Sequence, residues 1–315
     1  MKRIILSLGV AIMTVAAMTG ATRVVKVPAE INTISTSSTL SVTVKEAQSP
    51  AKVTISGPDK AILNEITATV KGKDLGFATT YHGKNTGERY KNVTITYEGV
   101  LPSGYSASSS GKIKVQGAVT KSGDMNIAVT SSGDVEIPAV TCATLRIAAT
   151  SSGDVELGSV KARSLNIGTS SSAEVEITSV SCTDAVIAAS SSSEVEIKNL
   201  KADTATSTAS SSAEIEVKNS QCKNISVTAS SSADFKFTQV TADNLTVVSS
   251  SSAKTVFEKV SCGNVSATAS SGGDIILSGS AKHATLSATS GGSVIRKGFT
   301  CPSPAITTGS GGKVK

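Results

Sequence analysis

The chain has 315 residues, of which 39% are hydrophobic and 3% aromatic, and it carries a net charge of +6 with no Trp. The apolar content is sufficient for a folded core and excludes a disordered chain. The cations are dispersed and are not interleaved with aromatic residues, which argues against nucleic-acid binding. No basic stretch has a helical period, which argues against a helix lying on a membrane surface.

The first segment is typical of a secretory signal peptide. Lys2 and Arg3 precede the apolar run "IILSLGVAIMTVAAM" and a group of small residues, so we expect residues 1–21 to be the signal peptide, with cleavage near Ala21. The run is shorter than the roughly 20 residues of a membrane span, and no second one follows. We therefore expect a mature chain without a membrane span, exported to the periplasm, the outer surface or the extracellular medium.

Residues 22–110 predict strands of uneven spacing. The segments "TLSVTVKEA", "AKVTISGPD", "EITATVKG" and "KNVTITYEGV" each alternate apolar and polar residues. An open end of a stacked β structure would expose unpaired strand edges, so an end needs a cap. We interpret residues 22–110 as irregular first coils and a β cap.

One loop in this part groups side chains suited to acid–base chemistry. They are Tyr81, His82, Glu88, Arg89 and Tyr90. With the C-terminal turn around His283, this is where catalytic groups could converge, and a catalytic cluster is the alternative hypothesis. The expectation is a solvent-exposed loop, because Gly83 and Gly87 are typical of turns.

From residue 111 to residue 315 the sequence is periodic, with a repeat of twenty residues. "TSSGDVEIPAVTCATLRIAA" (130–149) is followed by "TSSGDVELGSVKARSLNIGT" (150–169), and the period holds without slippage to Ser270. "SGKIKVQGAV" resembles a unit with a two-residue insertion, and "SGGSVIRKG" and "SGGKVK" resemble terminal turns. Residues 111–315 are therefore expected to form one regular array.

Each unit contains three apolar strips in strand-like alternation. In the first clear unit they are Val135 with Ile137, then Val140, then Leu145 with Ile147. One unit cannot bury three strips alone, but stacked units pair strand on strand and enclose a continuous core. A column of Gly, Ala and Ser precedes the first strip and suits a tight bend. The predicted fold is an all-β, parallel, right-handed β-helix with about 20 residues per coil.

Four cysteines recur forty residues apart within the array. They are Cys142, Cys182, Cys222 and Cys262, and Cys301 follows near the C-terminus. Residues two coils apart lie roughly 9.6 Å apart along the axis, farther than the roughly 7 Å that a disulfide spans between Cα atoms. We expect reduced thiols that fill the core, and a thiolate metal site is disfavoured because close partners are missing.

Outward carboxylates form two columns along the array. The first contains Asp134, Asp154, Glu174, Glu194, Glu214 and Asp234, and the second contains Glu136, Glu156, Glu176, Glu196 and Glu216. Neighbouring charges roughly 4.8 Å apart in water repel by about 0.9 kcal/mol. We expect a solvated face with local lysines and neither a cofactor nor a dedicated metal site. Weak calcium binding by the first column is the alternative.

Serines form a third repeated column. Ser170 and Ser172, with their equivalents in other coils, are expected to point outward in a flat ladder, and Ser171 is expected to face the corner. No His or Lys recurs in register with them, so nucleophilic catalysis is disfavoured. A solubilising role is expected. Binding of a glycan or an ordered surface is the alternative, and ice binding is disfavoured because Thr is scarce in this ladder.

The sequence resembles the putative auto-transporter adhesins with a head GIN domain. The resemblance rests on the signal peptide, on "LSVTVKEAQSPAKVTISGPDKAILNEITATVKG" and on the recurring "SSGDVEI" and "SSGDVEL" units, and it covers nearly all of the mature chain. It implies an exported bacterial β-helix protein with a role at the surface or in the periplasm, and no catalytic residues. Later units replace Gly-Asp with Ala-Glu, Ser-Glu or Ala-Lys.

Two functions follow as hypotheses. The first is a non-enzymatic, adhesin-like or cell-envelope structural protein that binds a surface glycan or protein through its long polar faces. The alternative is a polysaccharide-active lyase or hydrolase, because enzymes also use this fold. An enzyme cleft requires loop insertions that bring a local carboxylate pair and aromatic residues together, and the central units hold their period with no such insertion.

Overall fold

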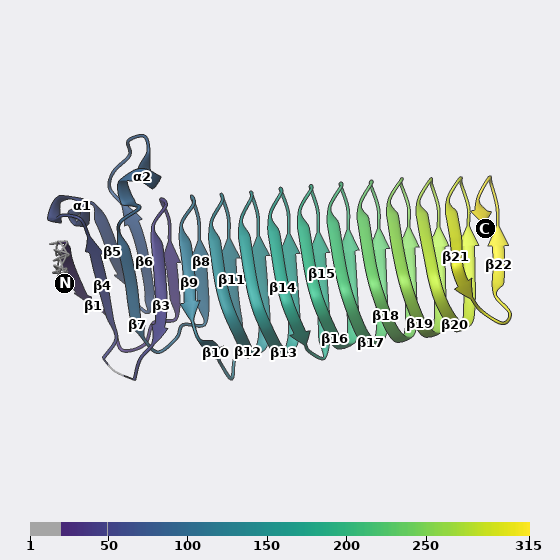
Figure 1. Cartoon of the computed structure of the whole chain (residues 1–315), viewed down its shortest axis with the longest axis horizontal. Coiled ribbons are helices and arrows are strands. Elements are labelled where there is room, and N and C mark those ends of the chain that lie inside the picture. Colours follow the sequence, from purple (N-terminus) through teal and green to yellow (C-terminus); the bar gives the residue numbers. More distant parts are fainter. Residues whose placement is uncertain (1–19, 49) are drawn as a thin grey trace, which may run out of the picture.

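The computed structural model describes residues 20–48 and 50–315, and it forms a stack of β coils along one long axis (Figure 1). All strands belong to one continuous hydrogen-bonded sheet that winds around the axis. The all-β, parallel β-helix fold is confirmed, and the hand of its coil stays a prediction. The predicted signal peptide lies almost wholly outside the described residues.

The N-terminal part contains short strands and two short helices. The strands are β1 (Ala21–Lys26), β2 (Thr33–Thr36), β3 (Ser41–Glu46), β4 (Lys52–Gly57), β5 (Ile66–Lys71), β6 (Asp74–Thr79), β7 (Thr94–Gly99) and β8 (Gly104–Ala107). The helices are α1 (Lys60–Asn64) and α2 (Thr86–Tyr90). The α2 loop projects from the stack near its N-terminal end (Figure 1).

The array is built mainly from long strands that each contribute most of one coil. Its strands are β9 (Lys112–Gln116), β10 (Ala118–Thr120), β11 (Met125–Val129), β12 (Asp134–Ala149), β13 (Asp154–Thr169), β14 (Glu174–Ser181), β15 (Asp184–Ala189), β16 (Glu194–Ala209), β17 (Glu214–Ala229), β18 (Asp234–Ser249), β19 (Lys254–Ala269), β20 (Asp274–Ala288), β21 (Ser293–Thr300), β22 (Ala305–Thr308) and β23 (Lys313–Val314).

Each regular coil divides into three straight segments. β12 pairs in parallel with β13, residue on residue at an offset of twenty, and the pairing is interrupted at Pro138 and Ala143. We name the pieces the first segment (134–137), the second segment (139–142) and the third segment (144–149), together with their equivalents in other coils. The bends between segments create the three sides that the three apolar strips predicted.

A tight two-residue turn closes each coil at the pointed upper edge of the stack in Figure 1. In one of these turns Ser131 and Ser132 adopt left-handed φ values of 53° and 60°, paired serines repeat this in each coil up to Ser251 and Ser252, and Ser-Gly pairs replace them in the last coils. The N–H of Gly133 donates to the carbonyl oxygen of Thr130 (3.0 Å), and that of Ser132 donates to Ser151 in the next coil (3.1 Å). These bonds offset a left-handed backbone that costs about 1–2 kcal/mol per residue.

The core is a continuous column of aliphatic side chains inside the coil. Val135, Val140 and Leu145 represent the three strips, and each is at most 1% exposed. Aromatic residues are buried at several levels, including Tyr97 and Tyr105 near the N-terminal end and Phe237, which stacks on Phe257 of the next coil with ring centroids 5.0 Å apart. Stacked strips bury apolar surface in every coil, and this burial stabilises the array.

The order of coils at the N-terminal end differs from the order of the sequence. β2 pairs with both β6 and β8, and β3 pairs with both β7 and β9. The β2–β3 coil is therefore inserted between two coils that come later in the sequence. β1, β4 and β5 pair antiparallel with their neighbours. The irregularity of this part was predicted from the sequence, but this permutation was not.

Small irregularities adjust the period at both ends of the array. Lys112 pairs with Asp134, 22 residues on, whereas Met125 pairs with Leu145 at the regular offset of twenty. The stretch from Lys112 to Met125 therefore contains two more residues than its equivalent in the next coil. Gly117, with a φ of 106°, lies in this stretch and adopts a conformation that favours glycine. The predicted two-residue insertion is confirmed.

Candidate binding faces

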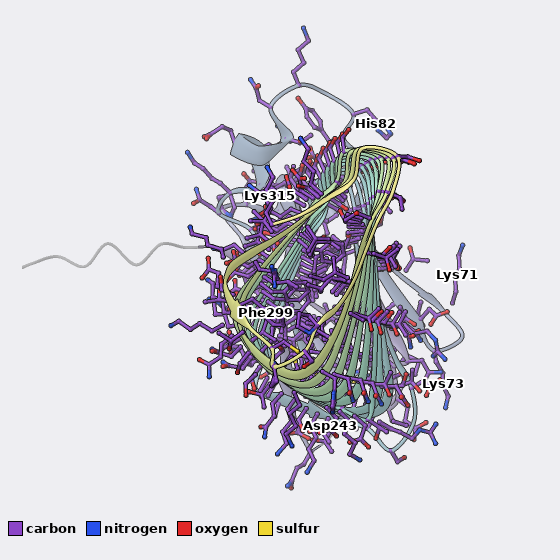
Figure 2. All side chains as sticks on the ribbon, turned by 90° about the vertical axis from the view of Figure 1, so that its right-hand side faces the viewer. Lys71, Lys73, His82, Asp243, Phe299 and Lys315 are labelled. Carbon is purple, nitrogen blue, oxygen red and sulfur yellow. The ribbon has the colours of Figure 1, made fainter. Side chains whose placement is uncertain are left out.

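The three segments present three outer faces that differ in chemistry. We name them the acidic face (first segments), the amide–lysine face (second segments) and the hydroxyl face (third segments). Figure 2 looks along the axis and shows side chains projecting all around the flattened coil. Because the register is constant, each outward position becomes a column along the molecule.

The acidic face contains both predicted carboxylate columns, and lysines lie at their ends. Lys112 contacts Asp134 at 2.7 Å and Lys114 contacts Glu136 at 2.7 Å. At the other end Lys236 contacts Glu216 at 2.9 Å. The expectation of a carboxylate face with local lysines is confirmed in this geometry.

Carboxylates in the middle of the acidic face repel one another. Partial burial, followed by the charges of neighbouring carboxylates, raises the pKa of Asp154, Glu174 and Glu214. The calcium candidates Asp134, Asp154, Glu174, Glu194 and Glu214 form one straight column. Across residues 20–48 and 50–315, no three His, Cys, Asp or Glu side chains converge as metal ligands do. Calcium binding by this column stays a prediction.

The amide–lysine face contains a groove. The groove has a volume of about 420 Å³. Asn199, Lys201, Asn219 and Gln221 are among the residues that line it. Asn219 donates from Nδ2 to Oδ1 of Asn199 at 3.1 Å, so amides stack between coils here.

The hydroxyl face carries two outward columns of small polar side chains in the C-terminal half. They are Thr206, Thr208, Ser226, Thr228, Thr246, Ser266, Thr268, Thr285 and Ser287, with Val248 among them. All are exposed or half-buried. This face was not predicted from the sequence, although the alternation of these residues with buried Ala205 and Val227 was a signal for it.

The serine ladder lies at the turns and not on a flat strand. Ser171 and Ser172 are both exposed, with φ values of 56° and 62°, while Ser170 is half-buried. The expectation that Ser171 faces the corner is therefore wrong. Both residues occupy the tip of a two-residue left-handed turn, so both side chains face solvent.

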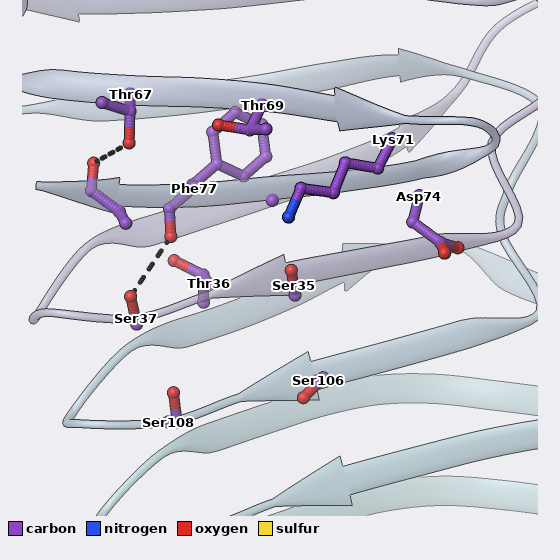
Figure 3. Close-up of a pocket in the computed structure, with 12 residues that line it drawn as sticks. Ser35, Thr36, Ser37, Thr67, Thr69, Lys71, Asp74, Phe77, Ser106 and Ser108 are labelled. Carbon is purple, nitrogen blue, oxygen red and sulfur yellow. Dashed lines mark hydrogen bonds between the residues drawn. The ribbon is translucent and has the colours of Figure 1, made fainter.

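A second groove lies at the N-terminal end, where β5, β6, β2 and β8 lie side by side (Figure 3). It has a volume of about 400 Å³ and is lined by hydroxyl groups, with Lys71 and Asp74 at one end. Gly76 leaves room there, since a Cβ at this position would lie 3.1 Å from Oγ of Ser35. The sequence did not predict this groove, because the permuted coil order brings its walls together.

The predicted acid–base loop contains a structural ion pair. Arg89 donates from Nε to Oε2 of Glu65 at 2.7 Å, and the hydroxyl of Tyr90 donates to the same oxygen at 2.7 Å. The hydrogen bonds from Arg89 and Tyr90 lower the pKa of Glu65 to about 2. The guanidinium of Arg89 lies over the ring of Tyr81, 4.4 Å from its centroid. Glu65 was not singled out in the sequence.

The remaining members of that loop have other surroundings. Glu88 contacts Lys91 at 2.6 Å. His82 is exposed near the outer end of the projecting loop, as Figure 2 shows. The hydrogen bonds from Arg89 and Tyr90 to Glu65 hold α2 against the body of the molecule, which fits the expectation of a loop better than that of a catalytic cluster.

The array cysteines occupy core positions at the corner before the third segment. Cys142, Cys222 and Cys262 are buried and Cys182 is half-buried, and all four have free thiols, as does Cys301. Burial raises the pKa of Cys142, Cys182 and Cys262 to about 11. The prediction that these residues fill the core is confirmed, and their redox state in solution stays a prediction.

In the part of the chain that the structure describes, no helix is long and apolar enough to cross a membrane.

Known proteins were compared with the chain by sequence and by fold. No curated protein matches the chain. A solved "putative lipid binding protein" from Parabacteroides distasonis is 15% identical, with a TM-score of 0.55 over 94% of this chain and 95% of that one. This likeness shows a shared fold.

A solved "putative adhesin" from Bacteroides fragilis is 17% identical, with a TM-score of 0.49 over 72% of this chain and 93% of that one. The family model described as "Putative auto-transporter adhesin, head GIN domain" matches residues 30–222 and 223–315. The chain therefore belongs to the head GIN domain family of putative auto-transporter adhesins.

Proposed function

We propose that this protein is an exported, non-enzymatic, adhesin-like or cell-envelope structural protein. It binds a surface glycan or protein through its long polar faces, and it does not act on nucleic acid. The signal-peptide pattern of residues 1–21 and the family membership support export.

One observation carries this proposal, the constant register of the coils. From β12 to β19 each outward residue lies beside its equivalent twenty residues on. Catalysis requires different groups aimed at one reacting atom. A register of this kind instead spaces like groups evenly, which suits multivalent contact with an extended or repetitive partner.

A binding screen tests the proposal. Purified mature protein is immobilised and exposed to panels of glycans, envelope proteins and nucleic acids, and retention is measured at physiological salt. We expect saturable retention of a glycan or protein, and none of nucleic acid. In parallel, new reducing ends and unsaturated products are followed with each polysaccharide. Turnover that disappears in His82→Ala or Glu88→Ala would overturn the proposal.

A further inference from the structure

A polar trough runs along the axis in the C-terminal half of the molecule. It lies where the second segment bends into the third, beside Asp243 in Figure 2. Its volume is about 520 Å³. We name it the amide trough, and its polar lining consists of Asn244, Thr246, Asn264, Ser266, His283, Thr285 and Ser303.

One column of the trough is a directional ladder of asparagine side chains. Asn244 donates from Nδ2 to Oδ1 of Asn224 at 2.8 Å, and Asn264 donates from Nδ2 to Oδ1 of Asn244 at 2.8 Å. A side-chain amide has two N–H donors, so each of these donors keeps one N–H free. The residue paired with Asn264 in the next coil is His283, so the ladder of amides ends there with Oδ1 of Asn264 able to accept.

A second column, from the hydroxyl face, runs beside this ladder, two positions along the same third segments. Thr246, Ser266 and Thr285 are exposed, and no hydrogen bond of their side chains occurs within the described residues. Leu245 and Val265 lie between the two columns but are buried, at 1% and 3% exposed. The trough thus offers free donors and acceptors in two parallel columns, spaced roughly 4.8 Å apart along the axis.

The trough lining contains no Asp, Glu, Lys or Arg. Asp243 and Lys282 lie one position before the lining residues Asn244 and His283. The acidic face and the amide–lysine face, in contrast, carry charged side chains such as Glu136 and Lys201. A partner of the trough therefore needs many hydrogen-bonding groups and no net charge, because a phosphate or carboxylate would find no cation among the lining residues.

We propose that the amide trough binds a neutral oligosaccharide whose chain runs along the axis of the coils. Sugar hydroxyls both donate and accept, which matches the free amide and hydroxyl groups of the two columns. Oδ1 of Asn264 and the ring of His283 hold one sugar hydroxyl between them. This inference rests on the proposed function, because it names the ligand class of one face of a binding protein.

The experiment measures affinity for soluble polymers by calorimetry on the mature protein. The probes are dextran, mannan and cello-oligosaccharides as neutral glycans, with alginate and polygalacturonate as acidic ones. Phosphatidylglycerol vesicles test a lipid surface. We expect at least one neutral glycan to bind and the acidic polymers and vesicles not to bind.

Variants locate the site. Asn264→Leu combined with His283→Ala removes about two hydrogen bonds and should lower the affinity about tenfold or more. Thr246→Val combined with Thr285→Val changes side-chain shape little and should lower the affinity several-fold. This second variant tests the site if the first variant folds poorly. The matched control is Asn199→Leu with Asn219→Leu, a stacked amide pair on another face, which should leave the affinity unchanged.

The outcomes separate this inference from the proposed function. Neutral glycan binding that depends on Asn199 and Asn219 but not on the trough would overturn the inference and leave the proposed function intact. Preferred binding of acidic polymers or vesicles would overturn the inference in the same way. Binding of none of the glycans would also overturn it, and the proposed function would then depend on a protein partner in the wider screen.

Discussion

At the scale of single residues, the alternation within each segment decides which substitutions the fold accepts. Val175 is 0% exposed, whereas Ser172, three residues earlier, is exposed at the tip of a turn with a φ of 62°. Asn and Asp tolerate left-handed φ better than most residues do, because their short polar side chains bond locally. Position within the coil therefore outweighs residue type.

A pair of variants tests this assignment. Val175→Asp places an unpaired charge in the core and should destabilise the protein by more than about 4 kcal/mol. Ser172→Asn should change stability by less than about 0.5 kcal/mol. Chemical denaturation followed by circular dichroism gives both values, and equal losses in the two variants would contradict the register.

The buried thiols provide a second test at this scale. Because burial raises the pKa of Cys142, Cys182 and Cys262 to about 11, few thiolates are present at pH 8 in the folded protein. We expect slow alkylation of these cysteines in the native state and rapid alkylation in denaturant without a reductant. Mass spectrometry distinguishes the residues, and a disulfide between any two array cysteines would refute the prediction.

At the scale of elements, the acidic face combines repulsion between coils with partial burial. The raised pKa of Glu174 and Glu214 means that the folded chain binds more protons than the unfolded chain between the ordinary carboxyl value of 4.5 and the raised value. The free energy of unfolding should therefore fall as the pH rises through this window. Glu65 has the opposite effect on the pH dependence of stability. Its pKa is lowered to about 2, so its contribution to the free energy of unfolding is lost as the pH falls toward that value.

Neutralising two neighbouring carboxylates tests the repulsion. Glu174→Gln with Glu194→Gln should raise the free energy of unfolding at pH 7 and low salt by up to about 1 kcal/mol, and the melting temperature with it. Added salt should shrink this gain, because it screens the repulsion. Asp243→Asn, outside the two carboxylate columns, serves as the control and should have no such effect. A double variant that melts earlier than the parent protein would show that these carboxylates stabilise the face.

The same double variant tests calcium. We expect at most weak calcium binding to the column from Asp134 to Glu214, since carboxylates alone lack the carbonyl oxygens of a dedicated loop. Calorimetry at physiological ionic strength measures it. A tight stoichiometric site in the parent protein that is lost in the double variant would establish a calcium site on this face.

At the scale of the whole molecule, the array is made of nearly interchangeable coils. β13 pairs with β14 and β15, and these pair with β16, all at the same offset. Stability in such a stack is approximately a sum of coil and neighbour contributions. The number of coils can therefore change without altering the fold of each coil.

Deleting one coil tests this separability. Removal of residues 170–189 should leave a folded, monodisperse protein with a similar β spectrum and a melting temperature within a few degrees, because β13 can then stack on β16 in register. Removal of residues 170–179 alone should unfold or aggregate the protein, since it mismatches the apolar strips. Circular dichroism and light scattering are the measurements, and similar behaviour of the two deletions would contradict the stacked-coil register.

The sequence by itself determined the regular array. The strict period of twenty placed Val135, Val140 and Leu145 in three strips, and the cysteines and both carboxylate columns followed from the same register. Local alternation is sufficient here, because each coil contacts only its neighbours and every neighbour has the same pattern. The two-residue insertion after Lys112 was readable for the same reason.

Only the tertiary structure decided what depends on contacts distant in sequence or on backbone conformation. The insertion of the β2–β3 coil between β6–β7 and β8–β9, and the groove that it creates, require strand pairings that alternation does not specify. The exposure of Ser171 depends on a left-handed turn that an L-residue adopts only because inter-coil hydrogen bonds hold it. The amide trough required the Asn224–Asn244–Asn264 ladder, because alternation does not specify hydrogen bonds between side chains of neighbouring coils.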